Sequence, residues 1–148
     1  MKVYNSTLVY IEKEDKYLML HRNKKAGDIN EGKWIGVGGK FEFGESPEDC
    51  MEREVFEETG LTPLGYYYCG IVTFVSEDLD NPEKNETEYM HLFNVKDFEG
   101  KLKDCDEGEL VWVEKDKLLT LPHWKGDELF LSVIKNGNRQ FFSMKLSY

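Results

Sequence analysis

The most informative part of the chain is residues 39–61, GKFEFGESPEDCMEREVFEETGL, because it contains one helix whose two ends are both marked. Ser46 can cap the N-terminus, the proline after it suits the first helical position, and Asp49 can complete a capping box. Gly60 suits the left-handed position that follows a last helical turn. These signals predict a helix over residues 46–59.

Three carboxylates of this predicted helix fall on one of its faces. Glu54, Glu57 and Glu58 stand at i, i+3 and i+4, and side chains with that spacing are neighbours on a helix. Two of them also occupy the last turn, where the helix dipole disfavours each anion by about 0.3–1 kcal/mol. Arg53 can offset only part of the repulsion, through an i,i+4 contact with Glu57. A divalent cation would reverse the penalty, and a solvated acidic face is the alternative interpretation.

The same stretch resembles the Nudix box, G-x5-E-x7-R-E-U-x-E-E-x-G-U with U an apolar residue, at every specified position. The matching residues are Gly39, Glu45, Arg53, Glu54, Val55, Glu57, Glu58, Gly60 and Leu61. The resemblance implies an α/β fold, a Nudix-type α/β/α sandwich with a mixed β-sheet. It also implies a loop–helix–loop that binds Mg²⁺, or Mn²⁺ as a substitute, and hydrolyses a nucleoside diphosphate-linked substrate.

The resemblance assigns roles to residues inside the box. Glu54, Glu57 and Glu58 match the metal-binding carboxylates of the family. Arg53 matches the arginine that orients the catalytic glutamates through ion pairs, and Glu45 matches an auxiliary position.

Residues outside the box complete the implied catalytic site. Gly38, just before the box, corresponds to a backbone carbonyl ligand of the metal in MutT-type members. Two candidates remain for the carboxylate that deprotonates the attacking water: Glu54, and a carboxylate outside the helix. Glu107 is the outside candidate for catalysis and metal binding, because a Glu shortly before a Trp-containing strand reaches the metals in MutT-like proteins. It lies five residues before Trp112, and Glu109 is the competing choice.

The resemblance to a subgroup suggests a substrate. Three segments resemble the purine nucleoside triphosphate diphosphatases that sanitise oxidised nucleotides: GKW at 32–34 leading into GVGGK at 36–40, the Trp112 strand, and LPHW at 121–124. That likeness implies hydrolysis of a substrate such as 8-oxo-dGTP to monophosphate and pyrophosphate. Trp124 would stack on the base and Asp127 would contact the base edge.

The phosphates and the base edge need further groups. The basic residues after position 21 could bind phosphates, and Arg22 and Lys40 are the substrate-binding candidates; Lys24, Lys25 and Lys33 belong to the same basic segment. One position departs from the subgroup pattern. Ile35 stands where an Asn commonly hydrogen-bonds the base, so the usual guanine contact is missing.

Other functions are compatible with the same box. The chemistry could act on ADP-ribose or a nucleotide sugar, on a dinucleoside polyphosphate, or on an RNA 5′ end. A non-catalytic nucleotide-binding module is a further alternative, although such a module has no need of the complete set Arg53, Glu54, Glu57 and Glu58.

The segments around the box predict a strand-rich domain. Strands are predicted over residues 2–12, 17–20, 34–37, 66–75, 89–95, 110–113 and 142–147. A second, amphipathic helix is predicted over 127–136, and polar connections over 23–33 and 76–88. This mixed order favours an α/β sandwich over a parallel doubly wound sheet, in a single Nudix domain that spans residues 1–148.

Composition limits the partners and the compartment. The net charge of −10 disfavours unspecific binding to duplex nucleic acid. A small nucleotide is the partner that the resemblance to the Nudix family implies. No apolar run approaches a membrane span and the N-terminus lacks a signal-peptide cleavage site, so a cytoplasmic location is predicted. Three widely spaced cysteines predict neither a disulfide framework nor a zinc site. The sequence leaves monomer and homodimer open.

Overall fold

A computed structural model of the protein describes residues 1–23, 27, 31–135 and 140–147. The predicted phosphate-binding candidates Lys24 and Lys25, and the last residue of the predicted second helix, Asn136, lie outside the described residues. Within the described part of the chain, no helix is long and apolar enough to cross a lipid bilayer.

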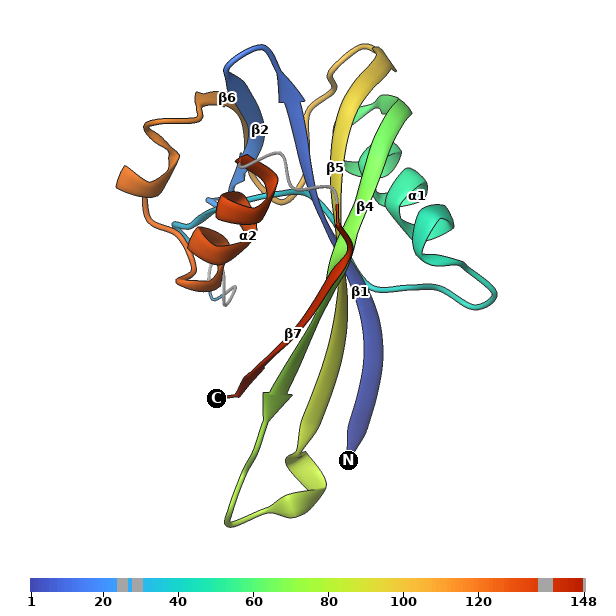
Figure 1. The fold of residues 1–148 in the computed structure, drawn as a ribbon, viewed down its shortest axis with the longest axis vertical. Helices are drawn as coiled ribbons and strands as arrows, with labels where there is room; N and C mark the ends of the chain where they lie inside the picture. The colour runs from blue at the N-terminus through green and yellow to red at the C-terminus, as the bar shows by residue number, and fades with distance from the viewer. Residues whose placement is uncertain (24–26, 28–30, 136–139, 148) are drawn as a thin grey trace.

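The described residues form a mixed sheet of seven strands with a helix on each side (Figure 1). The strand order is β3-β2-β1-β5-β4-β7, and β6 pairs with β2. The strands are β1 (Lys2–Lys13), β2 (Lys16–His21), β3 (Trp34–Ile35), β4 (Leu61–Ser76), β5 (Glu86–Gly100), β6 (Glu109–Glu114) and β7 (Phe142–Ser147). Parallel pairs join β1 to β5 and β4 to β7, and the other pairs are antiparallel. The predicted α/β/α sandwich is confirmed.

The helices begin and end close to their predicted limits. They are α1 (Pro47–Thr59) and α2 (Gly126–Lys135), with 3₁₀ turns at Pro82–Lys84 and Leu118–Thr120. Ser46 caps α1 with the predicted capping box, and Gly60 ends it at φ 82°. Both local signals were therefore sufficient to place this helix.

The sheet has a separate core on each face. Met51 and Val55 of α1 are fully buried against Val9, Ile11 and Phe93 of the central strands. On the opposite face, α2 contributes buried residues to a second cluster with strand residues; its members Phe130, Leu131 and Ile134 pack with Tyr10, Met90 and Leu92. The sheet therefore holds α1 and α2 on fixed, opposite sides.

The long hairpin of β4 and β5 differs from the prediction. β4 begins at Leu61, directly after α1, and β5 begins at Glu86 and continues to Gly100. The added strand residues pair with each other across the hairpin, Leu61 with Gly100 and Ser76 with Glu86. The predicted connection over 76–88 is consequently shorter. Pairing partners distant in sequence stabilise these strand ends, and local propensity did not reveal them.

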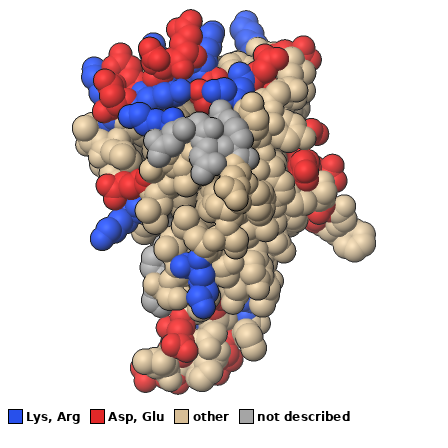
Figure 2. Space-filling model, viewed as in Figure 1, with Lys and Arg blue, Asp and Glu red and all other residues tan. Residues whose placement is uncertain are grey.

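Charged side chains are unevenly placed on the surface. Figure 2 shows acidic and basic groups gathered mainly towards the two ends of the molecule in this view, while the middle carries mostly uncharged residues. The three cysteines, Cys50, Cys69 and Cys105, are free, as predicted.

Candidate active site

The site is organised around α1 and the loop that leads into it. Asp49 N donates to Ser46 Oγ at 3.0 Å and Ser46 N donates to Asp49 Oδ2 at 3.0 Å. This reciprocal cap fixes where the helix starts relative to the loop that begins at Gly38. The buried side chains of Met51 and Val55 then press α1 against the sheet, so its acidic residues are directed to the loop side.

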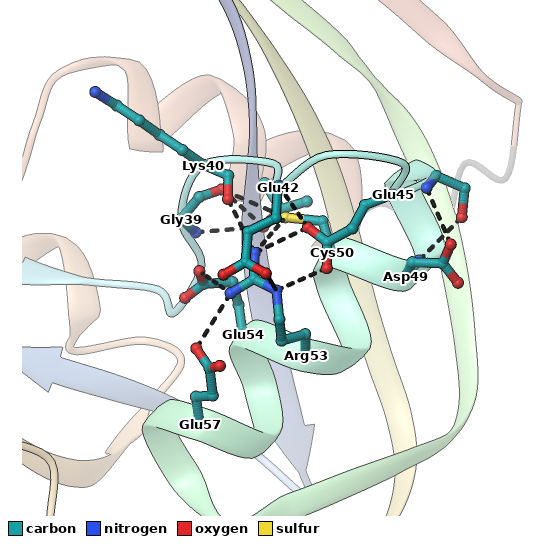
Figure 3. A network of polar contacts seen from close by, with 11 residues as sticks. Gly39, Lys40, Glu42, Glu45, Asp49, Cys50, Arg53, Glu54 and Glu57 are labelled. Carbon is teal, nitrogen blue, oxygen red and sulfur yellow. Dashed lines mark hydrogen bonds and ion pairs between the residues drawn. The ribbon is translucent and has the colours of Figure 1, made fainter.

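Arg53 connects the loop to the acidic face of α1 (Figure 3). Its guanidinium donates to both oxygens of Glu45, from Nε at 2.6 Å and from Nη2 at 2.9 Å. Nη1 donates to Glu54 at 2.8 Å and to Glu57 at 3.1 Å, which confirms the predicted i,i+4 contact. Nη2 also donates to the carbonyl of Lys40 at 3.0 Å. One cation therefore forms hydrogen bonds to three carboxylates, and those to Glu45 lower the pKa of that side chain.

Two glycines let the loop approach the helix carboxylates. Gly38 has φ 146°, a left-handed value, and a Cβ there would lie 2.1 Å from the Thr7 carbonyl oxygen. Gly38 N donates to Glu58 Oε2 at 2.7 Å. A Cβ on Gly39 would lie 2.6 Å from Glu54 Oε1. The backbone at these positions thus lies directly against Glu54 and Glu58.

Glu58 is a buried carboxylate in an acidic environment. Only 9% of the residue is exposed, and burial raises its pKa to about 8, with further increases from the charges of Glu54 and Glu107 and an opposing hydrogen bond from Gly38. Burial also raises the pKa of Glu54, and the negative charges of Glu57 and Glu107 raise it further. The mutual effects mean that carboxylates from α1 and from the turn before β6 converge at one place.

Glu107 is the better placed of the two candidates outside the helix. Its carboxylate accepts a hydrogen bond from Arg22 Nη1 at 3.0 Å and acts electrostatically on Glu54 and Glu58. Glu109 is exposed and lies in β6 opposite His21. The turn formed by the bridge between Cys105 and Gly108 directs Glu107 to the site.

The convergence of Glu54, Glu58 and Glu107 fits a hard divalent cation. The side-chain groups that could bind the cation are all carboxylates, whose oxygens are the ligands that Mg²⁺ and Mn²⁺ prefer. A bound cation would also relieve the repulsion between these crowded like charges. Within residues 1–23, 27, 31–135 and 140–147, no group of three or more acidic, His or Cys side chains already has a geometry that could hold a metal ion. Glu57 is one reason why the described carboxylates lack this geometry, because its side chain is more than half exposed and forms an ion pair with Arg53.

The predicted substrate-binding residues come from different elements: Arg22 follows β2, Lys40 lies in the loop before α1, Trp124 precedes α2 and Asp127 lies in the first turn of α2. Lys40 follows Gly39, and its ammonium lies 4.6 Å from the centroid of the Tyr4 ring. Trp124 is 40% exposed, and the Lys33 ammonium lies 4.6 Å from the centroid of its ring. The exposed ring offers a surface on which a base could stack.

Asp127 holds the start of α2 in place. It accepts hydrogen bonds from Tyr10 Oη at 2.9 Å and from Trp124 N at 3.2 Å. Burial raises its pKa, against the effect of these hydrogen bonds. The partnership with Tyr10 was missed by the sequence analysis, because strand alternation predicts a buried tyrosine but not its distant partner.

The α/β/α sandwich and its cluster of carboxylates indicate the class of protein, a hydrolase of nucleotide-type substrates. Comparison with known proteins identifies the family. A family model described as the NUDIX domain matches residues 3–133. The chain therefore belongs to the Nudix family and is a Nudix hydrolase. Members of this family generally use divalent metal ions.

Individual relatives agree with this assignment. The oxidized purine nucleoside triphosphate hydrolase of Danio rerio is 33% identical over 135 residues, which cover 90% of this chain and 80% of that protein. The uncharacterized Nudix hydrolase YvcI of Bacillus subtilis is 31% identical over 129 residues, which cover 86% and 76%. The crystal structure of a MutT protein from Bacillus halodurans has a TM-score of 0.82 at 27% identity, and covers 98% of this chain and 90% of that one.

Proposed function

We propose that the chain hydrolyses an oxidised purine nucleoside triphosphate, such as 8-oxo-dGTP, to the monophosphate and pyrophosphate with Mg²⁺, for which Mn²⁺ can substitute. The observation that carries the proposal is the convergence of Glu54, Glu58 and Glu107 beside the Gly38–Gly39 backbone. The relatives from Danio rerio and Mus musculus, both described as oxidized purine nucleoside triphosphate hydrolases, support the substrate class. The proposal places this activity in the cytoplasm.

Four carboxylates and one backbone group would hold the metal. They are Glu54, Glu57, Glu58 and Glu107, with the carbonyl of Gly38. When bound, Mg²⁺ lowers the pKa of water and neutralises phosphate charge. For Glu57 to take part, its side chain, which is more than half exposed, would exchange its contact with Arg53 for one with the metal.

The chain's own residues would position the water and accept its proton. The water oxygen forms a bond to phosphorus, the anhydride bond between the α- and β-phosphates breaks, and pyrophosphate leaves. Glu54 or Glu107 would take the proton from the attacking water. Arg53 keeps Glu54 oriented at 2.8 Å and Arg22 keeps Glu107 oriented at 3.0 Å, so both candidate bases are held by a cation.

Substrate binding would use groups on both sides of the metal loop. Arg22 and Lys40 would neutralise phosphate oxygens. Trp124 would stack on the base, and Asp127 would contact the base edge and fix Trp124 through its backbone N–H.

The test is an assay of pyrophosphate and phosphate release from a panel of nucleotides, with Mg²⁺, with Mn²⁺ and with a chelator. We expect pyrophosphate from 8-oxo-dGTP, none after chelation, and a loss of about 100-fold or more in kcat for Glu54→Gln. Glu52→Gln is the matched control, because Glu52 is an exposed carboxylate of the same helix.

Different products would lead to different conclusions. A phosphosugar, or turnover without pyrophosphate, would replace the proposed substrate with a nucleotide sugar or a capped RNA 5′ end. Nucleotide binding without any turnover, even in Mn²⁺, would favour a binding module. Size-exclusion chromatography would decide between a monomer and a homodimer.

A further inference from the structure

A row of side chains crosses the sheet on the face that carries α2. Residues opposite each other in neighbouring strands point to the same face, and the strand register identifies the row as Tyr4, Glu88, Phe74 and Leu146. The Phe74 ring packs edge-on against Phe130 of α2, with 6.4 Å between ring centroids. Glu88 is therefore an acidic side chain on the same face of the sheet as α2.

The carboxylate of Glu88 is held by two hydroxyl groups. Ser6 Oγ donates to Oε2 at 2.6 Å, and Tyr4 Oη donates to Oε1 at 3.1 Å. Ser6 is 5% exposed, so its hydroxyl has little freedom. No lysine or arginine in the described ranges forms an ion pair with Glu88. Each carboxylate oxygen can accept more than one hydrogen bond, so each keeps room for a second donor.

Glu88 lies close to the loop that precedes the acidic helix. Ser6 forms a β-bridge with Lys40, the residue after Gly39. The Lys40 ammonium lies over the ring of Tyr4, the other hydroxyl partner of Glu88. Ser6 therefore links the two residues: its hydroxyl binds the Glu88 carboxylate, and it forms the bridge with Lys40, the proposed phosphate-binding lysine.

The proposed base-stacking residue lies on the same face. Tyr4, Ser6 and Tyr10 are two or four residues apart in β1 and so point to one side of the sheet. Tyr10 donates to Asp127, whose other oxygen accepts from Trp124 N. Each oxygen of Asp127 and each oxygen of Glu88 thus accepts one hydrogen bond from the protein, but Asp127 is buried, whereas Glu88 is only half-buried.

We infer that Glu88 is a specificity-determining residue that reads two adjacent N–H donors of a guanine-type base, the ring N1–H and the 2-amino group; this inference rests on the proposed function. The two oxygens of one carboxylate lie side by side and can accept hydrogen bonds from two adjacent N–H donors. Adenine and cytosine present a ring acceptor beside their amino group, and a carboxylate would repel it. Glu88 would then supply the hydrogen bonds that Ile35 cannot make.

The experiment compares binding of two nucleotides that differ only in the 2-amino group. Non-hydrolysable α,β-methylene analogues of dGTP and dITP are titrated with Mg²⁺ into the wild-type chain and into Glu88→Gln. We expect the wild type to bind the guanine analogue about 10-fold or more tightly than the hypoxanthine analogue. In Glu88→Gln, which exchanges one acceptor for a donor, this ratio should fall to about 1–3. A ratio unchanged by the substitution would overturn the inference.

Two further variants separate base recognition from stability. Glu86→Gln changes the next acid of the same face, which pairs with Lys2 at 3.7 Å, and should leave the ratio unchanged. Tyr4→Phe removes one hydroxyl that orients Glu88 and should lower the ratio by about 2–5-fold while the carboxylate stays. Equal losses in all three variants would show a structural effect and overturn the inference.

Because binding is measured without hydrolysis, this inference and the proposed function can fail separately. Selective guanine binding that depends on Glu88, together with no pyrophosphate release from any nucleotide, would overturn only the proposed function. Pyrophosphate release from 8-oxo-dGTP by a chain that does not prefer the guanine analogue, or whose preference survives Glu88→Gln, would overturn only the role of Glu88.

Discussion

Arg53 grips both carboxylate oxygens of Glu45, with its Nε at 2.6 Å and its Nη2 at 2.9 Å. This two-point ion pair ties the loop before α1 to the helix, and the third nitrogen of the same guanidinium reaches Glu54 and Glu57. Position and charge of the acidic residues therefore depend on a planar group with several fixed donors.

Arg53→Lys should consequently impair hydrolysis although the charge is kept. A lysine ammonium cannot bind Glu45 at two points and reach Glu54 simultaneously, so the carboxylates lose their fixed orientation. We expect kcat/KM to fall by about 10–100-fold, measured as pyrophosphate release at saturating Mg²⁺. Activity within twofold of wild type would show that the ion pairs do not orient the site.

Glu58→Gln should stabilise the metal-free protein and abolish its activity. The raised pKa means that folding must bury or protonate this carboxyl near Glu54 and Glu107, and the substitution removes that cost, while the amide oxygen can still accept the hydrogen bond from Gly38. We expect a gain on the order of 2 kcal/mol in the free energy of unfolding in chelator, because each unit of pKa shift corresponds to about 1.4 kcal/mol. Thermal melts with and without Mg²⁺ measure it. The metal should stabilise the wild type more than the variant, and a less stable variant in chelator would contradict the crowding of these charges.

The sequence contained enough information for the helix and its acidic face, because those signals are local. Ser46, Asp49 and Gly60 act within a few residues of the helix ends, and the carboxylate spacing follows from helical geometry alone. The position of Glu107 opposite Glu58 depends on the turn between Cys105 and Gly108, and periodicity does not describe it.

Contacts between distant strands could not be predicted. Ser6 and Glu88 are 82 positions apart, and only the parallel register of β1 with β5 brings them together. The same holds for Tyr10 and Asp127, 117 positions apart. The start of β4 at Leu61 was missed for a related reason, since its pairing with Gly100 overrides the weak strand propensity around Pro63.

Stability should fall at acid pH through a network outside the active site. Burial disfavours the charged form of Glu12, but hydrogen bonds from Lys115, Asn94 and Lys96 outweigh it and lower its pKa below 4.5. A lowered folded-state pKa means that the stabilisation is present above the unfolded value and is lost as pH falls through the folded one. Glu12→Gln should therefore lose about 1–2 kcal/mol at pH 7, a modest figure because Lys115 and Lys96 are partly exposed.

Denaturant unfolding of the wild type and Glu12→Gln between pH 7 and pH 3 measures this difference. It should shrink as the pH falls towards the lowered pKa of folded Glu12, because protonation removes the charge that the substitution also removes. A difference that stays constant with pH would mean that packing, and not the charge of Glu12, stabilises this part of the sheet. Pyrophosphate release at pH 7 should be the same in both proteins, because the network has no contact with Glu54 or Glu58 in the described residues.

Gly39→Ala should separate catalysis from stability in the loop. A Cβ at this position would lie 2.6 Å from Glu54 Oε1, so the new methyl group must displace that carboxylate. The displaced atom is the end of a flexible side chain, and we expect the free energy of unfolding to change by less than about 1 kcal/mol. A shift of about 1 Å in a catalytic group lowers rates by about 100-fold, so kcat for pyrophosphate release should fall by that order.

Gly44→Ala provides the control, because a Cβ at Gly44, in the same loop, would meet nothing within 4 Å. Because Gly44 has a left-handed φ of 81°, this substitution should reduce stability and leave kcat nearly unchanged. If Gly39→Ala retained full kcat, the contact between this backbone and Glu54 would have no part in catalysis.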